Sequence, residues 1–359
     1  MSAPREDILR NSDTMADEAS RVVQMVVTVV IFVVGVTMNG LVVWVLGLRR
    51  RKLRGSVGCE TQGAGSFRVY VVNLAVSDLV LLLRTPLMLG YLANHNSWPF
   101  GEPVCQLVMV LRCLGLYAGA FLLSAVAVER CLCLLRPVWA RLRRPRWVVP
   151  VVCTLLWIIA SALSVPYIQS SGIKEFNNRT QCIENKDGHT LIVMETVGGF
   201  LLPLVLFLSC NLAVILAARR AEKRPTVVTT PPTSPTSPTS PTGSNYTSQK
   251  MTRLYQVLFL TMLIFLTCWV PYFTCRFLKA LFEAKGWLDL MYRAMKGTYV
   301  ALYLVYIKSA LNPILYVFAA RGLRHTVRAS LLSTIERVFN EDMSESLRRK
   351  SLRRKDSQF

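Results

Sequence analysis

The chain has 359 residues, of which 52% are hydrophobic, and its 42 lysines and arginines outnumber 21 acidic residues to give a net charge of +21. A soluble protein this apolar would aggregate, and a nucleic-acid-binding protein this basic would contain fewer apolar residues. Apolar membrane spans joined by charged loops explain both properties. The cysteines and histidines show no metal-ligand spacing, and the sequence contains no nucleotide-binding loop or nucleophile elbow. We therefore expect a membrane protein that is not an enzyme, has no metal or cofactor, and does not bind nucleic acid.

Seven apolar stretches follow one another along the chain, and each is at least as long as the ~20 residues that a helix needs to cross the hydrocarbon core. They cover residues 22–48, 69–92, 104–135, 147–168, 190–218, 251–281 and 292–318. The first stretch has an acidic approach and no small-residue cleavage site, which indicates a signal anchor rather than a cleaved signal peptide. We therefore predict an all-α membrane protein, with a bundle of seven transmembrane helices over residues 22–318.

Basic residues concentrate in the loops on one side of the predicted bundle. They occur at 49–52, 136–146, 219–224 and 348–355, whereas the opposite loops contain few lysines and arginines. Because basic loops stay in the cytosol, we expect residues 1–21 to be an extracellular tail and the C-terminus to be cytosolic, in a multi-pass protein of the plasma membrane. The same basic loops attract anionic membrane lipids.

Three further segments have the composition of connecting or peripheral structure. Residues 225–249 contain a Thr-Ser-Pro repeat, and we predict a disordered third cytosolic loop that is either a solvated spacer or a docking site for kinases and SH3 domains. Residues 319–340 form an amphipathic pattern that predicts a helix on the inner leaflet. Residues 341–359 form a basic cytosolic tail whose serines are candidates for phosphorylation.

Ionisable and polar residues inside membrane spans are costly and therefore mark function. Asp78 lies in the middle of the second stretch, and Glu129 and Arg130 close the third. Prolines in the sixth and seventh stretches leave a backbone carbonyl free and kink the helix, which provides a bend about which one half can move.

These motifs, in this order, resemble those of the class A (rhodopsin-like) G-protein-coupled receptors. The matching residues are Asn39, Asp78, Cys105, Glu129, Arg130, Trp157, Pro203, Trp269, Pro271, Asn312, Pro313 and Tyr316. The resemblance covers nearly all of residues 22–339. It implies a receptor that passes a ligand signal to a heterotrimeric G protein, with arrestin and receptor kinases as further partners.

The resemblance also implies roles for individual residues. Arg130, paired with Glu129, would hold the inactive state and then reach the G protein. Trp269 and Pro271 would pass motion to the sixth helix, with Phe265 one turn below. Tyr316 would swing inward on activation.

Two features of the outer loops follow from the same resemblance and topology. Cys105, at the start of the third helix, and Cys182, in the second outer loop, are expected to form a disulfide in an oxidising compartment. Asn178 begins an Asn-Arg-Thr sequon four residues before Cys182, so we expect it to carry a glycan.

Arginines in the upper halves of the spans indicate the type of ligand. Arg112 lies two helical turns below Cys105, and Arg276 lies two turns above Trp269. Charges in a dry pocket require an anion or an acidic partner, and Glu195 is a candidate partner. The predicted ligand-binding residues are Arg84, Arg112, Glu195, Trp269 and Arg276, which would suit an anionic ligand with a long apolar body. The alternative is that the arginines extend to the lipid headgroups.

Shorter segments resemble particular receptors of the leukocyte chemoattractant branch. Residues 97–105 and 194–204 resemble leukotriene B4 receptors, and residues 130–139 and 331–342 resemble formyl-peptide and related receptors. Leukotriene B4, a fatty-acid carboxylate, suits the arginines, and the branch implies inflammatory signalling through an inhibitory G protein. A formyl-peptide or other peptide receptor, and a scavenging receptor that does not signal, remain the alternatives.

Lys308 departs from the pattern of the family. It lies one helical turn before Asn312, and the resemblance places it near Asp78, where receptors of this class commonly hold a sodium ion. We expect Lys308 to pair with Asp78 and to take the place of that ion. The alternative is that Lys308 turns toward the backbone carbonyls of another helix.

Overall fold

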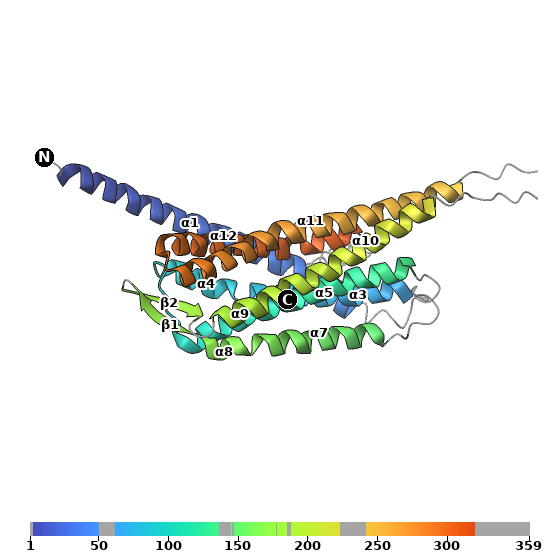
Figure 1. Ribbon diagram of the computed structural model, residues 1–359, viewed down its shortest axis with the longest axis horizontal. Coiled ribbons are helices and arrows are strands. Elements are labelled where there is room, and N and C mark those ends of the chain that lie inside the picture. The colour runs from blue at the N-terminus through green and yellow to red at the C-terminus, as the bar shows by residue number, and fades with distance from the viewer. Residues whose placement is uncertain are drawn as a thin grey trace, which may run out of the picture. The chain divides into compact units, whose positions relative to one another are not determined.

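The computed structural model describes residues 3–49, 62–135, 145, 147–176, 178–184, 188–222 and 242–319 (Figure 1). The chain divides into two units, Met1–Pro313 and Ile314–Phe359. In the second unit, the structure describes residues 314–319, which form the end of a helix. The predicted amphipathic helix, except its first residue, and the basic tail lie outside the described residues.

Helices make up nearly all of the described chain. In order, they are α1 (Ala3–Val42), the π-helical turn η1 (Val43–Arg49), α3 (Gln62–Leu82), α4 (Thr85–Ala93), α5 (Gly101–Leu135), α7 (Val148–Ser164), α8 (Pro166–Ser170), α9 (Gly188–Met194), the π-helical segment η2 (Glu195–Leu201), α10 (Leu202–Glu222), α11 (Thr242–Lys285) and α12 (Leu288–Ala319). The strands β1 (Ser171–Phe176) and β2 (Arg179–Glu184) form an antiparallel hairpin. Each of the seven predicted spans coincides with one helix or with consecutive helical segments.

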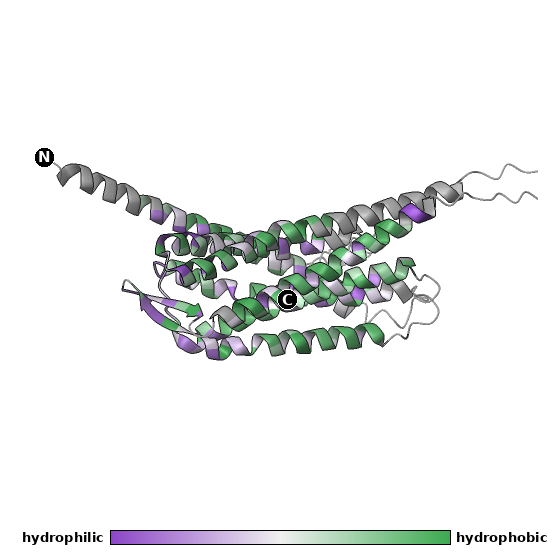
Figure 2. Ribbon diagram, in the orientation of Figure 1, coloured by the Kyte–Doolittle hydropathy of each residue, from purple (hydrophilic) through white to green (hydrophobic). Residues whose placement is uncertain are grey.

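Within the described residues, six helical stretches are long and apolar enough to cross a membrane. They are Asp17–Gly47, Gly65–Ala93, Gly101–Cys133, Val148–Ser170, Thr190–Ala217 and Leu263–Lys285. Figure 2 shows apolar residues along α5, α7 and α10, whereas the hairpin is largely hydrophilic. A helix satisfies all its backbone hydrogen bonds internally, which is why apolar stretches of this length adopt it in lipid. The seventh predicted span lies in α12, whose Arg293, Lys296 and Lys308 make it less apolar.

A proline follows the break before α4 and the break before α8, because proline cannot donate the hydrogen bond that continues a helix. Pro86 lies in the first turn of α4, and Pro166 begins α8 after a break at Val165. Pro271 lies inside α11 and Pro313 inside α12, as the sequence predicts.

The helices of the first unit pack closely where small residues allow it. The helix α5 contacts α3, α7 and α10, which places it at the centre of the packing. A Cβ atom added to Gly115 of α5 would lie 2.7 Å from Leu81 Cβ and 2.9 Å from Leu81 Cα, so the backbones of α3 and α5 approach closely at this point. The indole of Trp157 in α7 donates a hydrogen bond to Asn73 Oδ1 in α3, at 3.0 Å.

Two helix boundaries and one hairpin differ from the sequence-based expectation. α1 begins at Ala3, so most of the predicted tail 1–21 is helical. α11 begins at Thr242, which corrects the predicted disordered loop 225–249 over its last eight residues, because the proline repeat ends at Pro241 and the helix can extend back to that point. The predicted all-α fold is also interrupted by the β1–β2 hairpin.

Candidate functional site

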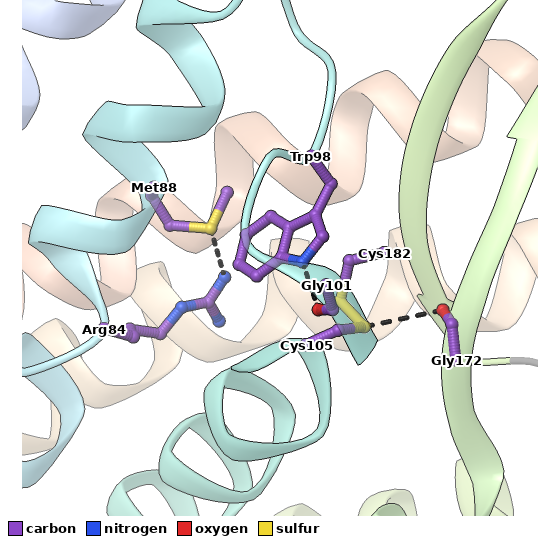
Figure 3. The surroundings of a disulfide bond; sticks show 7 residues. All are labelled: Arg84, Met88, Trp98, Gly101, Cys105, Gly172 and Cys182. Carbon is purple, nitrogen blue, oxygen red and sulfur yellow. Dashed lines mark hydrogen bonds between the residues drawn. A yellow bond between two sulfur atoms is a disulfide. The ribbon is translucent and has the colours of Figure 1, made fainter. Parts of the chain in front are cut away.

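The hairpin is fixed to the start of α5 by a disulfide. Cys105 and Cys182 are bonded, as predicted, and Cys105 is fully buried (Figure 3). The hairpin lies at the same end of the helices as α4, α8 and α9 (Figure 1). Asn178 lies exposed at its turn with φ of 57°, a left-handed conformation that asparagine tolerates well.

Four charged side chains from four elements meet below the hairpin. They are Arg112 of α5, Glu184 of β2, Glu195 of η2 and Arg276 of α11, and we call them the charge cluster. Arg112 donates a hydrogen bond to Glu184, and its Nη1 lies 3.7 Å from Glu195 Oε1. Arg276 Nη2 lies 3.1 Å from Glu184 Oε2 and 2.8 Å from Glu195 Oε2. Each arginine therefore contacts both carboxylates.

Glu195 is the most deeply buried member of the charge cluster, with 2% of its side chain exposed. The hydroxyl of Tyr167 in α8 donates to Glu195 Oε2 at 2.9 Å, and the hydroxyl of Tyr272 in α11 donates to Oε1 at 2.8 Å. Arg112 also donates to the Tyr272 hydroxyl. A buried carboxylate with this many donors is fully compensated. The predicted pairing of Glu195 with the arginines is confirmed.

The charge cluster holds two positive and two negative groups, so its formal charges cancel. Burial by itself would raise the pKa of the Glu184 carboxyl, but the guanidinium groups of Arg276 and Arg112 outweigh burial and lower that pKa to about 2. Glu184 is therefore ionised throughout the physiological pH range.

Arg84 lies at the junction of α3 and α4, and its side chain is differently placed from the other two arginines. It is 4% exposed, so it does not extend to the headgroups. Its Nη2 donates to Met88 Sδ at 3.3 Å (Figure 3), and its Cζ lies 5.7 Å from the centroid of the Tyr306 ring. Within the described part of the chain, its Nε and Nη1 have no hydrogen-bond partner and no ion pair includes it.

Two buried hydroxyl groups, Thr85 Oγ1 and Tyr306 Oη, also lack a hydrogen-bond partner among the described residues. Thr85 follows Arg84 in the chain, and the Tyr306 ring is the one that contacts the guanidinium. Because buried polar groups are nearly always hydrogen-bonded, this group of donors is suited to an external acceptor.

An aromatic stack connects the charge cluster to the predicted switch residues. The ring of Trp269 stacks on Phe265 with centroids 5.6 Å apart and on Phe273 at 5.5 Å. The ring of Tyr272, whose hydroxyl belongs to the hydrogen bonds of Glu195, meets Trp269 edge-on at 6.5 Å. Phe265 thus lies beside Trp269, as predicted, and Tyr272 joins this stack to the charges.

The polar residues predicted inside the spans form a second, separate network. Asn312 Nδ2 donates to Asp78 Oδ2 at 2.7 Å, and Asn39 Nδ2 donates to the carbonyl of Ser309 at 3.1 Å. Lys308 is buried and lies close enough for its charge to act on Asp78. Among the described residues, however, no ion pair within 4.0 Å joins Asp78 and Lys308, so the expected direct pairing does not form, and Asn312 donates a hydrogen bond to the carboxylate instead.

The predicted switch residues Glu129, Arg130 and Tyr316 are only partly described. Glu129 is 6% exposed, and the Cys133 thiol donates to its Oε1 at 3.8 Å. The side chains of Arg130 and Tyr316 lie outside the described part of the structure. The predicted pairing of Glu129 with Arg130 therefore stays a prediction.

Sequence reasoning missed Glu184, although a signal for it was present. Side chains two residues apart on a strand point to the same face, so Cys182 and Glu184 share a face of β2. Because the disulfide turns that face toward α5, Glu184 reaches Arg112. Predicting the contact between Glu184 and Arg112 required knowledge of both the strand and the disulfide. Glu184 also lies outside the apolar spans, and only inside them does a charged residue by itself indicate function.

Comparison with known proteins agrees with this architecture. Residues 38–316 match the family described as 7 transmembrane receptor (rhodopsin family). The chain is similar to the C3a anaphylatoxin chemotactic receptor of Danio rerio, with 25% identity over 335 residues, which cover 92% of this chain and 81% of the relative. It is similar to prostaglandin D2 receptor 2 of Mus musculus (27% identity; 90% of this chain and 78% of the relative) and to N-formyl peptide receptor 3 of Pan troglodytes (28%; 87% and 84%). The chain is therefore a multi-pass membrane receptor rather than an enzyme, and it belongs to the rhodopsin family of seven-transmembrane receptors.

Proposed function

We propose that this receptor recognises an anionic lipid mediator, with leukotriene B4 as the first compound to test, and signals to a heterotrimeric G protein of the inhibitory class. The observation that carries the proposal is the buried guanidinium of Arg84, which has two nitrogens without a hydrogen-bond partner among the described residues. The acid group of the ligand binds to these nitrogens. The hydroxyl groups of Thr85 and Tyr306 add further donors.

An unpaired buried charge is costly. A cation removed from water loses several kcal/mol of solvation, which pairing with a carboxylate or an equivalent anion offsets. Arg112 and Arg276 have such partners within the protein, namely Glu184 and Glu195. Arg84 does not have one among the described residues, so an acidic ligand gains most from contact with this arginine.

The names of the relatives support a chemoattractant ligand. The ligands in these names include both lipids and peptides. One relative is named for prostaglandin D2, which like leukotriene B4 is a fatty-acid carboxylate. Others are named for the anaphylatoxin C3a and for N-formyl peptides. A formyl peptide also ends in a carboxylate, so it is the second candidate, and the aromatic and apolar residues around Arg84 favour the lipid.

Signal transfer follows from the contacts inside the bundle. Tyr272 belongs both to the charge cluster and to the Trp269 stack, so a shift of α11 at the ligand end changes the packing around Trp269. Pro271 lies inside α11, where a proline is expected to bend the helix. The hairpin side is extracellular, the Glu129 side meets the G protein, and arrestin and receptor kinases act on that same side.

The proposal is tested by agonist-stimulated G protein activation in cells that express the receptor. The test compounds are leukotriene B4, prostaglandin D2 and N-formyl-Met-Leu-Phe. We expect a response to a lipid acid, and we expect Arg84→Gln to reduce its potency about ten- to hundredfold, because a hydrogen bond to a charged group contributes about 1.5–3 kcal/mol. Arg293→Gln, which changes an exposed arginine of α12, is the matched control and should leave potency unchanged.

The other outcomes contradict parts of the proposal. A response to the formyl peptide alone would assign the receptor to the peptide ligands. A lipid response that is unaffected by Arg84→Gln at equal surface expression would remove Arg84 from the site. Binding of leukotriene B4 without G protein activation would identify a scavenging receptor, and silence toward all three compounds would overturn the lipid assignment.

A further inference from the structure

Glu184 differs from the other members of the charge cluster in its position. Its side chain is 12% exposed, against 2% for Glu195, 5% for Arg112 and 10% for Arg276. It is also the member that comes from the hairpin rather than from a helical segment, and it is the last residue of β2. Of the two carboxylates, Glu184 is therefore the one that can be exchanged.

The contacts of Glu184 are those of a carboxylate bound between two guanidinium groups. Arg276 donates from Nη1 to Oε1 at 3.3 Å and from Nη2 to Oε2 at 3.1 Å, so this pair is bidentate. Arg112, which lies in α5, donates a hydrogen bond to the same Oε1. A fork of this kind matches the planar geometry of a carboxylate group. All the charged contacts that an external carboxylate would need are already in place.

Glu195 keeps the two arginines in position independently of Glu184. Its carboxylate contacts both Arg112 and Arg276 and accepts hydrogen bonds from Tyr167 and Tyr272. Without Glu184, two guanidinium groups would share a single carboxylate and the cluster would carry a net positive charge. Such a site would attract an anion.

We infer that Arg112 and Arg276 form a second carboxylate-binding site, which Glu184 of the β2 strand occupies as an internal ligand. The site takes a carboxylate when the Glu184 side chain moves out of it, and the occupant is an acid group other than the one proposed to bind Arg84. This inference goes beyond the proposed function, because it does not depend on Arg84 or on any agonist.

The test replaces the internal carboxylate with a free one. In Glu184→Ala receptor, purified in detergent, we expect the melting temperature to fall by roughly 5 °C, because one partner of buried ion pairs is lost. Sodium acetate should restore most of this loss in a saturable manner. Acetamide, which has the same shape without the charge, should not, and Glu175→Ala, an exposed residue of the same hairpin, should respond to neither compound.

Further variants separate this site from the rest of the receptor. Glu184→Ala combined with Arg276→Gln balances the remaining charges, so it should fold but lose the acetate effect. The effect of acetate on the melting temperature of the wild type, which includes binding at Arg84, is subtracted from the effect on each variant. If Glu184→Ala is not recovered from cells, Glu184→Ser gives the same comparison with a hydrogen-bonding group retained. Equal effects of acetate and acetamide, or an acetate effect that survives Arg276→Gln, would overturn the inference.

Discussion

Arg84, the proposed ligand anchor, is expected to favour ligand binding at the expense of the stability of the ligand-free protein. Its guanidinium is buried, donates to a methionine sulfur, and has two nitrogens without a partner among the described residues. A buried charge in this state is costly, whereas an apolar side chain of similar length would fill the same space. If Arg84 binds the ligand as proposed, stability and function oppose each other at this position.

We expect Arg84→Met to raise the melting temperature of the ligand-free receptor by about 2–4 °C, which corresponds to roughly 1 kcal/mol. The same variant should lose its response to acidic agonists. Arg293→Met, at a side chain that is 75% exposed, is the control and should leave the melting temperature unchanged. A melting temperature lowered by Arg84→Met would show that the arginine is a structural residue, which would contradict its role as the anchor of the ligand.

At the scale of elements, the contact between α3 and α5 depends on the absence of a side chain at Gly115. A Cβ atom at this position would lie 2.9 Å from the backbone of Leu81, which cannot move aside as a flexible side chain can. This contact lies between the helix that carries Arg112 and the helix that leads to Arg84. A change here should therefore alter the position of Arg112 relative to Arg84.

We expect Gly115→Ala to destabilise the receptor by about 1–3 kcal/mol, because it overpacks a tight interface, and to lower agonist potency. Gly40→Ala in α1 is the matched control, because an added Cβ atom there meets nothing within 4 Å. Thermal unfolding of the two purified variants measures the difference. Equal melting temperatures for Gly115→Ala and Gly40→Ala would show that the two helices are free to separate.

The elements were predictable from the sequence to the extent that they depend on local composition. Apolar length identified the spans, and Pro271 lies inside one of them, as expected. The start of α11 at Thr242 was missed, because a helix that leaves the membrane is no longer marked by hydropathy. The hairpin was missed for a different reason, since its pairing joins residues that no single apolar stretch contains.

At the scale of the whole molecule, the sequence identified individual charges better than their arrangement. Inward arginines and the role of Glu195 followed from helical spacing, and the structure brings Arg112, Arg276 and Glu195 together. The cancellation of these charges depends on Glu184, which reaches the bundle only because the disulfide holds its strand against α5. The sequence therefore overstated the positive charge at Arg112 and Arg276 and left the burial of Arg84 undecided.

The central claim is that the receptor recognises the acid group of its ligand through Arg84. The most direct measurement compares leukotriene B4 with its uncharged methyl ester on the wild type and on Arg84→Gln, by G protein activation at matched surface expression. We expect esterification to lower potency on the wild type about ten- to hundredfold and to have little further effect on Arg84→Gln, because both changes remove the same contact. Equal potency of acid and ester on the wild type, or losses that simply add in the variant, would contradict the claim.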